Sequence, residues 1–181
     1  MALSEEEQIQ QIVQDADAVD AYAAAHTPSE PPVDELTVLV HFGFHGLRAA
    51  HEGADPDDYL GHAYAEYCRV VYDDIRDTAA DPDAAVAALY PDGYEQRHRT
   101  VLGAPHRDVD WVPTWEDGAV FTEAGVTGFA ETYARLNDGG TVTVTGEDGE
   151  KCYQYTVNFL DALQQRGQTS FDIVRGPSYT R

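Results

Sequence analysis

The sequence predicts a mixed fold, α+β or α/β, in which a helical N-terminal half packs on a small C-terminal layer of strand, helix and strand. Residues 5–25 and 56–77 carry apolar side chains at helical spacing. Residues 141–145 alternate as a strand does, and a helical pattern over 150–166 separates them from a second short apolar run at 170–174. A strand, a helix and a strand in this order form a parallel unit with a right-handed crossover.

Helices dominate the elements expected in the first half. Ser4 and Glu7 form a capping box for a first helix that ends at about residue 25. Asp55 should cap a second helix, with Pro56 in its first turn, that runs to about residue 77. The buried side of this second helix is expected to comprise Leu60, Tyr64, Tyr67, Val71 and Ile75.

Two further segments of the first half have less distinct patterns. Residues 36–47 contain a β-branched run that suits a strand, but their length and flanks suit a buried helix, and we favour the helix. Residues 83–89 are rich in alanine and predict a short helix, which Tyr90-Pro-Asp-Gly93 stops.

Proline, glycine and tryptophan replace this alanine-rich pattern after residue 90. We therefore expect one compact domain over residues 1–181, with a helical sub-lobe over 1–90 and an α/β sub-lobe over 111–181, joined by a long connection over 91–110. In the second sub-lobe, residues 118–121 predict a short strand, and residues 125–136 a helix that Asn137-Asp-Gly-Gly140 closes. The side chains expected to face its core are Val142, Val144, Tyr153, Val157, Leu160 and Leu163.

Charge is the strongest compositional feature. The chain has 33 acidic residues against 11 basic ones, with a single lysine, Lys151, and a formal net charge of −22. Such a surface repels itself in dilute buffer but is tolerated at molar salt, where the screening length falls to about 3 Å. Because lysine is depleted and the acidic residues are spread along the chain, halophilic adaptation is favoured over mimicry of nucleic acid.

Several classes of function are disfavoured. The N-terminus lacks the pattern of a signal peptide and the longest weakly polar run, 36–47, is too short to span a membrane, so we expect a cytoplasmic protein without a membrane partner. No basic stripe is present to bind nucleic acid directly. Cys68 and Cys152 lie far apart without CxxC spacing, which indicates neither a zinc knuckle nor a disulfide framework.

Residues 97–107 hold the leading candidate for a binding site. Three of the ten arginines and two of the seven histidines fall within these 11 residues. Guanidinium groups grip phosphate or carboxylate in bidentate fashion, so a small anionic ligand is expected here. The alternative is that the arginines pair with the protein's own aspartates and fasten the connection to the body. The predicted ligand-binding residues are Arg97, Arg99, His106, Arg107 and the aromatic Trp111.

His41 and His45 form a second candidate site, because a spacing of four places them on one face of either a helix or a strand. Two such imidazoles can chelate a transition metal, with His51 or Glu52 nearby as further ligands. The alternative is a pair of buried histidines bonded to backbone carbonyls or lining an oligomer contact. His62 and Glu66 have the same spacing but lie opposite the apolar stripe, and are expected on a solvated face.

Cys152 is a weak candidate for a nucleophile. It lies at the start of the predicted 150–166 helix beside Lys151, and a helix N-terminus and an ammonium group both lower the pKa of a thiol. Neighbouring acidic residues at 147, 148 and 150 act in the opposite direction, so an inert, packed cysteine is favoured.

The function predicted from these features is a halophilic, cytoplasmic binding or regulatory module for a small anionic ligand. A transition-metal enzyme or sensor built on the histidine pair is the second hypothesis. An acidic subunit that binds a protein partner is the third. A homo-oligomer of this chain is a further expectation about its partners.

Overall fold

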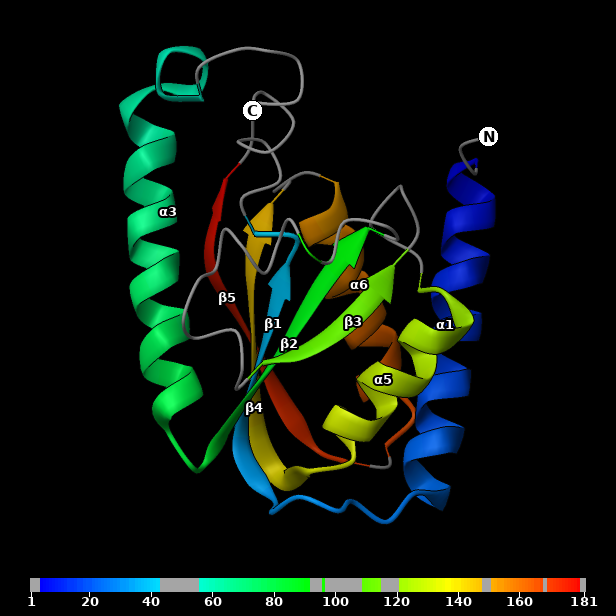
Figure 1. The fold of residues 1–181 in the computed structure, drawn as a ribbon. Helices are drawn as coiled ribbons and strands as arrows, with labels where there is room; N and C mark the ends of the chain where they lie inside the picture. Colours follow the sequence, from blue (N-terminus) through cyan, green and yellow to red (C-terminus); the bar gives the residue numbers. More distant parts are fainter. Residues whose placement is uncertain are drawn as a thin grey trace.

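The computed structural model describes residues 4–42, 56–91, 96, 109–114, 121–147, 151–167 and 169–179. Five strands of these residues form one parallel sheet in the order β3-β2-β1-β4-β5, and their arrows point toward the same edge (Figure 1). The strands are β1 (Val33–Val40), β2 (Ala84–Pro91), β3 (Asp110–Thr114), β4 (Leu136–Glu147) and β5 (Phe171–Tyr179). The mixed α/β class is confirmed, and strands from both halves of the chain share the sheet.

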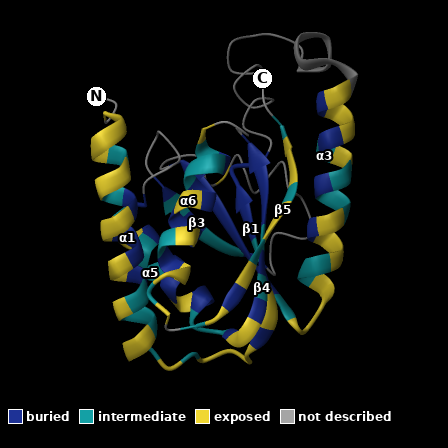
Figure 2. Ribbon diagram, turned by 180° about the vertical axis from the view of Figure 1, so that it is seen from behind, coloured by how far each residue is buried: buried dark blue, intermediate teal, exposed yellow. Residues whose placement is uncertain are grey.

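Helices cover both faces of the sheet, as parallel strands require. One face carries α1 (Glu5–Ala25), α5 (Glu123–Tyr133) and α6 (Cys152–Gln164), and the other carries α3 (Pro56–Ala80) (Figure 1). Strands β1, β2 and β4 are largely buried between these layers, whereas the edge strand β5 and the outer sides of the helices are more exposed (Figure 2). The β4-α6-β5 segment is the parallel strand-helix-strand unit that the sequence predicts.

Helix α1 begins with the predicted capping box. The Ser4 hydroxyl accepts a hydrogen bond from the Glu7 backbone N–H, and the Glu7 carboxylate accepts one from the Ser4 N–H at 2.8 Å. Only part of the expected apolar stripe is buried, because α1 packs against α5 and α6 rather than directly on the strands. Ile12, Ala16 and Val19 enter the core, whereas Ile9 and Val13 are exposed.

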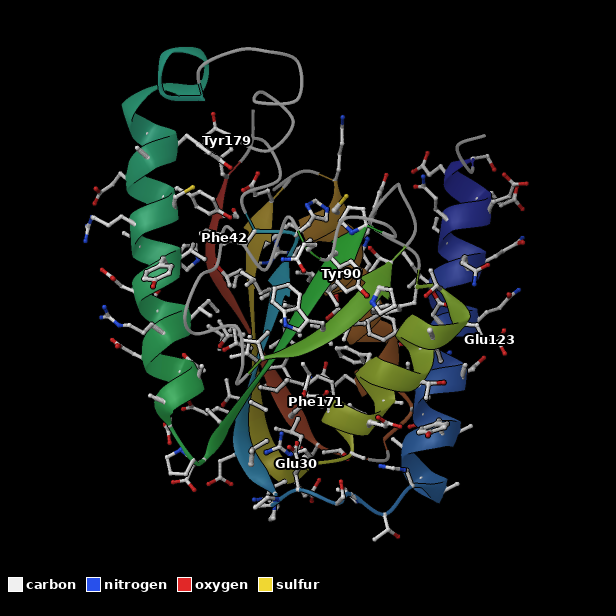
Figure 3. The ribbon with its side chains drawn as sticks, viewed as in Figure 1. Glu30, Phe42, Tyr90, Glu123, Phe171 and Tyr179 are labelled. Carbon is white, nitrogen blue, oxygen red and sulfur yellow. The ribbon has the colours of Figure 1, made fainter. Side chains whose placement is uncertain are left out.

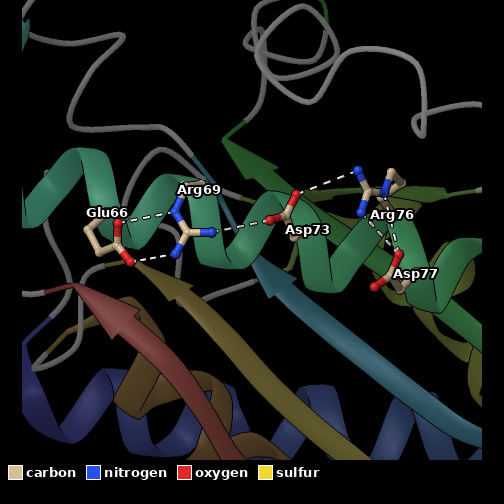
Figure 4. A network of polar contacts seen from close by, with 5 residues as sticks. All are labelled: Glu66, Arg69, Asp73, Arg76 and Asp77. Atoms are coloured by element: carbon tan, nitrogen blue, oxygen red, sulfur yellow. Dashed lines mark hydrogen bonds and ion pairs between the residues drawn. The ribbon is translucent and has the colours of Figure 1, made fainter.

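Helix α3 buries the predicted stripe and exposes a charged face. Tyr64, Tyr67, Val71 and Ile75 are buried; the Leu60 and His62 side chains lie outside the described residues, as does the expected cap Asp55. The exposed face carries a chain of ion pairs with N···O distances of 2.5–3.6 Å (Figure 4). Its members are Glu66, Arg69, Asp73, Arg76 and Asp77, so Glu66 lies on the solvated face as predicted.

Two segments favoured as helices in the first half are strands. The run 36–47 supplies β1, which ends at Val40, and residues 43–47 lie outside the described part. The alanine-rich segment 83–89 forms most of β2, which lies between β1 and β3. Pairing on both sides outweighs the helix propensity of alanine here.

The second half matches the prediction more closely, with changed boundaries. Helices α5 and α6 form where expected, but residues 137–140 belong to β4 instead of a loop that closes α5. A register shift between Val33 and Glu35 lets β4 pair with β1 across this irregular stretch. Phe121 makes an isolated bridge with Thr114, and residues 118–120 lie outside the described part. The sequence pattern does not predict β3.

Candidate ligand site at the switch point of the sheet

The strand order creates a switch point at the carboxyl edge of the sheet. From the central strand β1 the chain continues outward to β2 and β3, and then returns to place β4 and β5 on the other side of β1. In open α/β sheets, ligands bind outside the carboxyl ends of the strands at such a point. The described residues that end or follow these strands include His41, Phe42, Gly146, Glu147 and Tyr179.

Strands β1 and β4 approach each other closely at this point. Gly146 pairs with Val40 and has a φ of +131°, a conformation that favours glycine. A Cβ atom at position 146 would collide with the Val40 carbonyl oxygen. The β4-β5 register also shifts between Val144 and Gly146. The switch point is thus built on a backbone arrangement that requires glycine.

Glu147 follows this glycine and is fully buried, with 0% of its surface exposed. Tyr64 of α3 donates a hydrogen bond from its hydroxyl to Glu147 Oε1 over 3.0 Å. A carboxylate withdrawn from water is costly unless hydrogen bonds or charges compensate it. The Tyr64 phenol is one such compensation, and it fastens α3 to the end of β4.

Aromatic rings surround this carboxylate and its partner. Ring centroids are 4.8 Å apart for Tyr64 and Tyr179, 5.7 Å for Tyr67 and Tyr179, and 5.8 Å for Tyr64 and Tyr67. Phe42, which follows β1, lies 6.3 Å from the Tyr67 ring. Figure 3 shows Phe42 and Tyr179 on the α3 side of the sheet. We call Phe42, Tyr64, Tyr67, Tyr179 and Glu147 the edge cluster.

Tyr67 is the member of the edge cluster with an unsatisfied hydroxyl. Its side chain is only 8% exposed, and its hydroxyl has no hydrogen-bond partner among the described residues. Burial, with a smaller contribution from the Glu147 charge, raises the pKa of Tyr67 far above its ordinary value. The phenol therefore stays neutral and can donate a hydrogen bond, but it cannot act as a base near neutral pH.

The Cys68 thiol beside this cluster is poorly suited to nucleophilic chemistry. Burial raises its pKa to about 11, and the Glu147 charge adds to this, although a hydrogen bond with Tyr64 opposes the rise. A thiol with such a pKa holds almost no thiolate near neutral pH.

His41 lies at the switch point, but its predicted metal partner is not described. His41 directly follows β1, is 3% exposed and has a φ of +23°, and its backbone N–H donates to the Leu89 carbonyl over 2.9 Å. His45, His51 and Glu52 lie outside the described residues. Within the described ranges, no group of three or more histidine, cysteine or acidic side chains is arranged to hold a metal ion.

Of the predicted ligand-binding residues, the structure places Trp111 alone. Arg97, Arg99, His106 and Arg107 lie in the undescribed segment between β2 and β3. Trp111 is the second residue of the edge strand β3, where its ring lies 6.2 Å from that of Tyr90. Trp111 packs against the apolar cluster that includes Phe42, Tyr64 and Tyr67, although β2 separates its strand β3 from β1.

Trp111 also lines a groove of about 390 Å³ at the outer side of β3 and α5. The arginine in this groove, Arg135, already binds the protein's own acidic groups, with Nη1 3.0 Å from Glu30 and 3.9 Å from Asp110. Asp110 also accepts a hydrogen bond from the Thr132 hydroxyl over 2.8 Å. This groove is therefore a poor anion site.

Cys152 is the first residue of α6, as its predicted position at a helix start implies. It is a free cysteine of intermediate exposure that packs against the larger core. Its carbonyl accepts a hydrogen bond from the Thr156 hydroxyl over 2.7 Å.

Sequence reasoning did not identify Glu147 or Tyr67 as site residues. Tyr67 was expected only as a packing residue on the buried side of its helix, and Glu147 only as an acidic neighbour of Cys152. One signal for Glu147 was present, since positions 143, 145 and 147 continue the alternation of the strand toward a single face. An acidic residue at the end of such a strand can be buried at a ligand-binding edge.

Comparisons with protein-family models, with curated proteins and with solved structures gave no significant match. Among the helices of the described residues, none has the length and apolar character needed to cross a membrane.

Proposed function

We propose that this chain is a binding or regulatory module that holds a small anionic ligand at the carboxyl edge of its sheet. The observation that carries the proposal is the switch point between β1 and β4, which in this topology is the usual place for a ligand. The cation-rich segment supports it: β2, next to β1, ends at Pro91 on this edge, and Arg97 and Arg99 follow within eight residues.

The arginines outside residues 97–107 also support an anion site in that segment, because those in the described residues already contact other groups of the protein. Among the described residues, Arg69, Arg76, Arg135 and Arg166 form ion pairs with the protein's own acidic groups, and Arg175 donates to Gln154 Oε1. An anion site must therefore draw on other arginines. The 97–107 segment contains three of them.

The acidic surface fits a protein that works at molar salt in a halophilic cytoplasm, which is part of the same proposal. Screening is then short enough for the ligand anion to approach a protein of net charge −22. Selection of the anion would rest on direct guanidinium contacts, because long-range attraction is absent.

A thermal-shift screen of phosphorylated and carboxylated metabolites at constant ionic strength tests the proposal. We expect a ligand that raises the melting temperature of the wild type, and a loss of that response in Arg99→Gln and Arg107→Gln with their own melting temperatures nearly unchanged. Arg69→Gln, which changes an exposed arginine on α3, is the matched control and should respond as the wild type does. Destabilised variants without any response from the wild type would instead indicate arginines that only fasten the connection.

A transition-metal site remains a second proposal, favoured by the position of the buried His41 at the switch point. Protein purified in high salt without chelator should then contain stoichiometric metal, and His41→Ala and His45→Ala should each lose most of it. Stoichiometric metal in the double variant would exclude this pair.

A further inference from the structure

We propose that Tyr67 and Glu147 together bind a hydroxyl group of the ligand, so that the ligand is a hydroxylated anion such as a sugar phosphate or a sugar acid. This inference rests on the proposed function and specifies its ligand class. It starts from the Tyr67 hydroxyl, which is buried at the switch point and has no hydrogen-bond partner in the described part of the chain.

A buried hydroxyl without a hydrogen-bond partner lowers the stability of the fold. A ligand group that pairs with the Tyr67 hydroxyl would explain why a tyrosine occupies this position. Because the phenol stays protonated, the group that it meets must accept a hydrogen bond. A ligand carboxylate or phosphate fits poorly here, since the Glu147 charge that acts on Tyr67 would repel it in a buried setting. The acceptor is therefore a neutral oxygen.

A hydroxyl is the neutral oxygen that fits both neighbours. It accepts from Tyr67 through a lone pair and donates its own proton to the Glu147 carboxylate. The carboxylate has about four lone-pair positions, so the hydrogen bond from Tyr64 leaves room for other donors. A ligand carbonyl oxygen could accept a hydrogen bond from Tyr67, but it has no proton to donate to Glu147.

The aromatic rings suit the rest of such a ligand. The rings of Tyr64, Tyr67 and Tyr179 contact one another, and they offer apolar faces to the C–H groups of a polyol or sugar ring. Tyr179 is partly exposed, so the edge cluster reaches the molecular surface at the end of β5.

Isothermal titration calorimetry at constant molar potassium chloride tests this with three probes. Ribose 5-phosphate and ribonate carry hydroxyls with either a phosphate or a carboxylate, and inorganic phosphate carries no polyol. We expect at least one hydroxylated probe to bind about tenfold or more tightly than phosphate, the size of one good hydrogen bond. The stronger of the two identifies the anionic group.

In Tyr67→Phe this advantage should vanish, while phosphate affinity and the melting temperature stay at or above their wild-type values. Tyr72→Phe, on the same helix but outside the edge cluster, is the matched control and should keep the advantage. Equal binding of phosphate and both hydroxylated probes by the wild type would overturn the hydroxyl inference and leave the anion-binding function standing. Binding of none of the three would overturn the hydroxyl inference, and the thermal-shift screen would then decide separately whether any other anion binds.

A crystal structure of the wild type with the tighter probe gives an independent result. A ligand oxygen within hydrogen-bond distance of Tyr67 Oη is expected. A water molecule alone at that position, with the ligand bound elsewhere, would overturn the inference.

Discussion

The Tyr64 hydroxyl of α3 donates a hydrogen bond to the fully buried Glu147 at the end of β4, across 83 positions of sequence. Tyr67 follows one helical turn later, with its ring 5.8 Å from that of Tyr64, and its buried hydroxyl has no hydrogen-bond partner among the described residues. Two tyrosines of one helix therefore have opposite roles toward the stability of the fold.

Replacing each of these tyrosines by phenylalanine should have opposite effects on the free energy of unfolding. Tyr64→Phe removes a donor from a buried carboxylate and should lower stability by about 1–3 kcal/mol. Tyr67→Phe removes an unsatisfied polar atom and should leave stability unchanged or slightly raised. Urea denaturation in molar potassium chloride measures both, and equal losses in the two variants would contradict this difference.

The close approach at the switch point predicts a strong effect of Gly146→Ala. The positive φ is strained for alanine, and the new methyl group would collide with the Val40 carbonyl, so we expect a loss of about 3 kcal/mol or more. Gly128→Ala is the control, because a Cβ at this position of α5 meets no atom within 4 Å. That variant should gain about 0.5–1 kcal/mol from helix propensity. A tolerated Gly146→Ala would show that β1 and β4 can separate.

Asp15 predicts a pH-dependent contribution to stability. It is 4% exposed, and burial raises its pKa above the ordinary value of 3.8, although hydrogen bonds from the Gln11 side chain and the Phe121 backbone N–H oppose the rise. The folded state thus holds this proton more tightly than the unfolded state. Stability should fall as pH rises from about 3.8 through the raised pKa.

The test compares Asp15→Asn with the wild type as a function of pH, so that effects of the other carboxyl groups cancel. The wild type should lose stability relative to the variant as pH rises through this acidic window, and the difference should be constant above it. Asp161→Asn, which changes an exposed carboxyl group of α6, is measured alongside as the control. A wild type that gains relative to Asp15→Asn would contradict the direction of the pKa shift.

Stability should also depend on salt, because a net charge of −22 opposes the compact state when screening is weak. Far-ultraviolet circular dichroism should show loss of helix as potassium chloride falls from molar to about 0.1 M, where the screening length reaches roughly 10 Å. A full native signal with a cooperative melt at the lower concentration would contradict halophilic adaptation.

The ion-pair chain on α3 distinguishes acidic residues that already have a cationic partner from those that do not, and the two kinds should affect the salt midpoint differently. Asp73 and Asp77 already lie 3.3–3.6 Å from guanidinium nitrogens, so neutralising them also removes an attraction. Asp161 forms no ion pair with a described residue. Asp161→Asn should therefore move the salt midpoint to lower concentration, and Asp73→Asn should move it less. Equal shifts in the two variants would show that these exposed pairs contribute little.

Local patterns predicted elements whose stability depends on their own sequence. The capping box of Ser4 and Glu7 and the stripe of Tyr64, Tyr67, Val71 and Ile75 are examples, and both are confirmed. Strand β1 was predicted as a helix. A central parallel strand is buried on both faces, so its apolar run lacks the alternation that would distinguish it from a buried helix. Strand β2 was also predicted as a helix, because its alanines have high helix propensity. Pairing with β1 and β3, which the local sequence does not reveal, stabilises it as a strand.

The candidate site was harder to predict for the same reason. The edge cluster joins residues of α3, β4 and β5 with Phe42, which follows β1, and only the strand order brings Phe42, Tyr64 and Glu147 together. The sequence prediction of an anion site at 97–107 relied on local charge and remains a prediction.

The pairing of β1 with β4 also determines when the sheet can be completed during synthesis of the chain. Asp34 and Asn137, joined by a side-chain hydrogen bond of 2.9 Å at the start of these strands, are 103 residues apart. At a translation rate of about 5–20 residues per second, the central strand leaves the ribosome roughly 5–20 seconds before its partner exists. During that interval β2 is the only parallel neighbour that β1 can gain from the described strands, so the nascent chain must keep an apolar strand edge from aggregating until residue 147 has emerged.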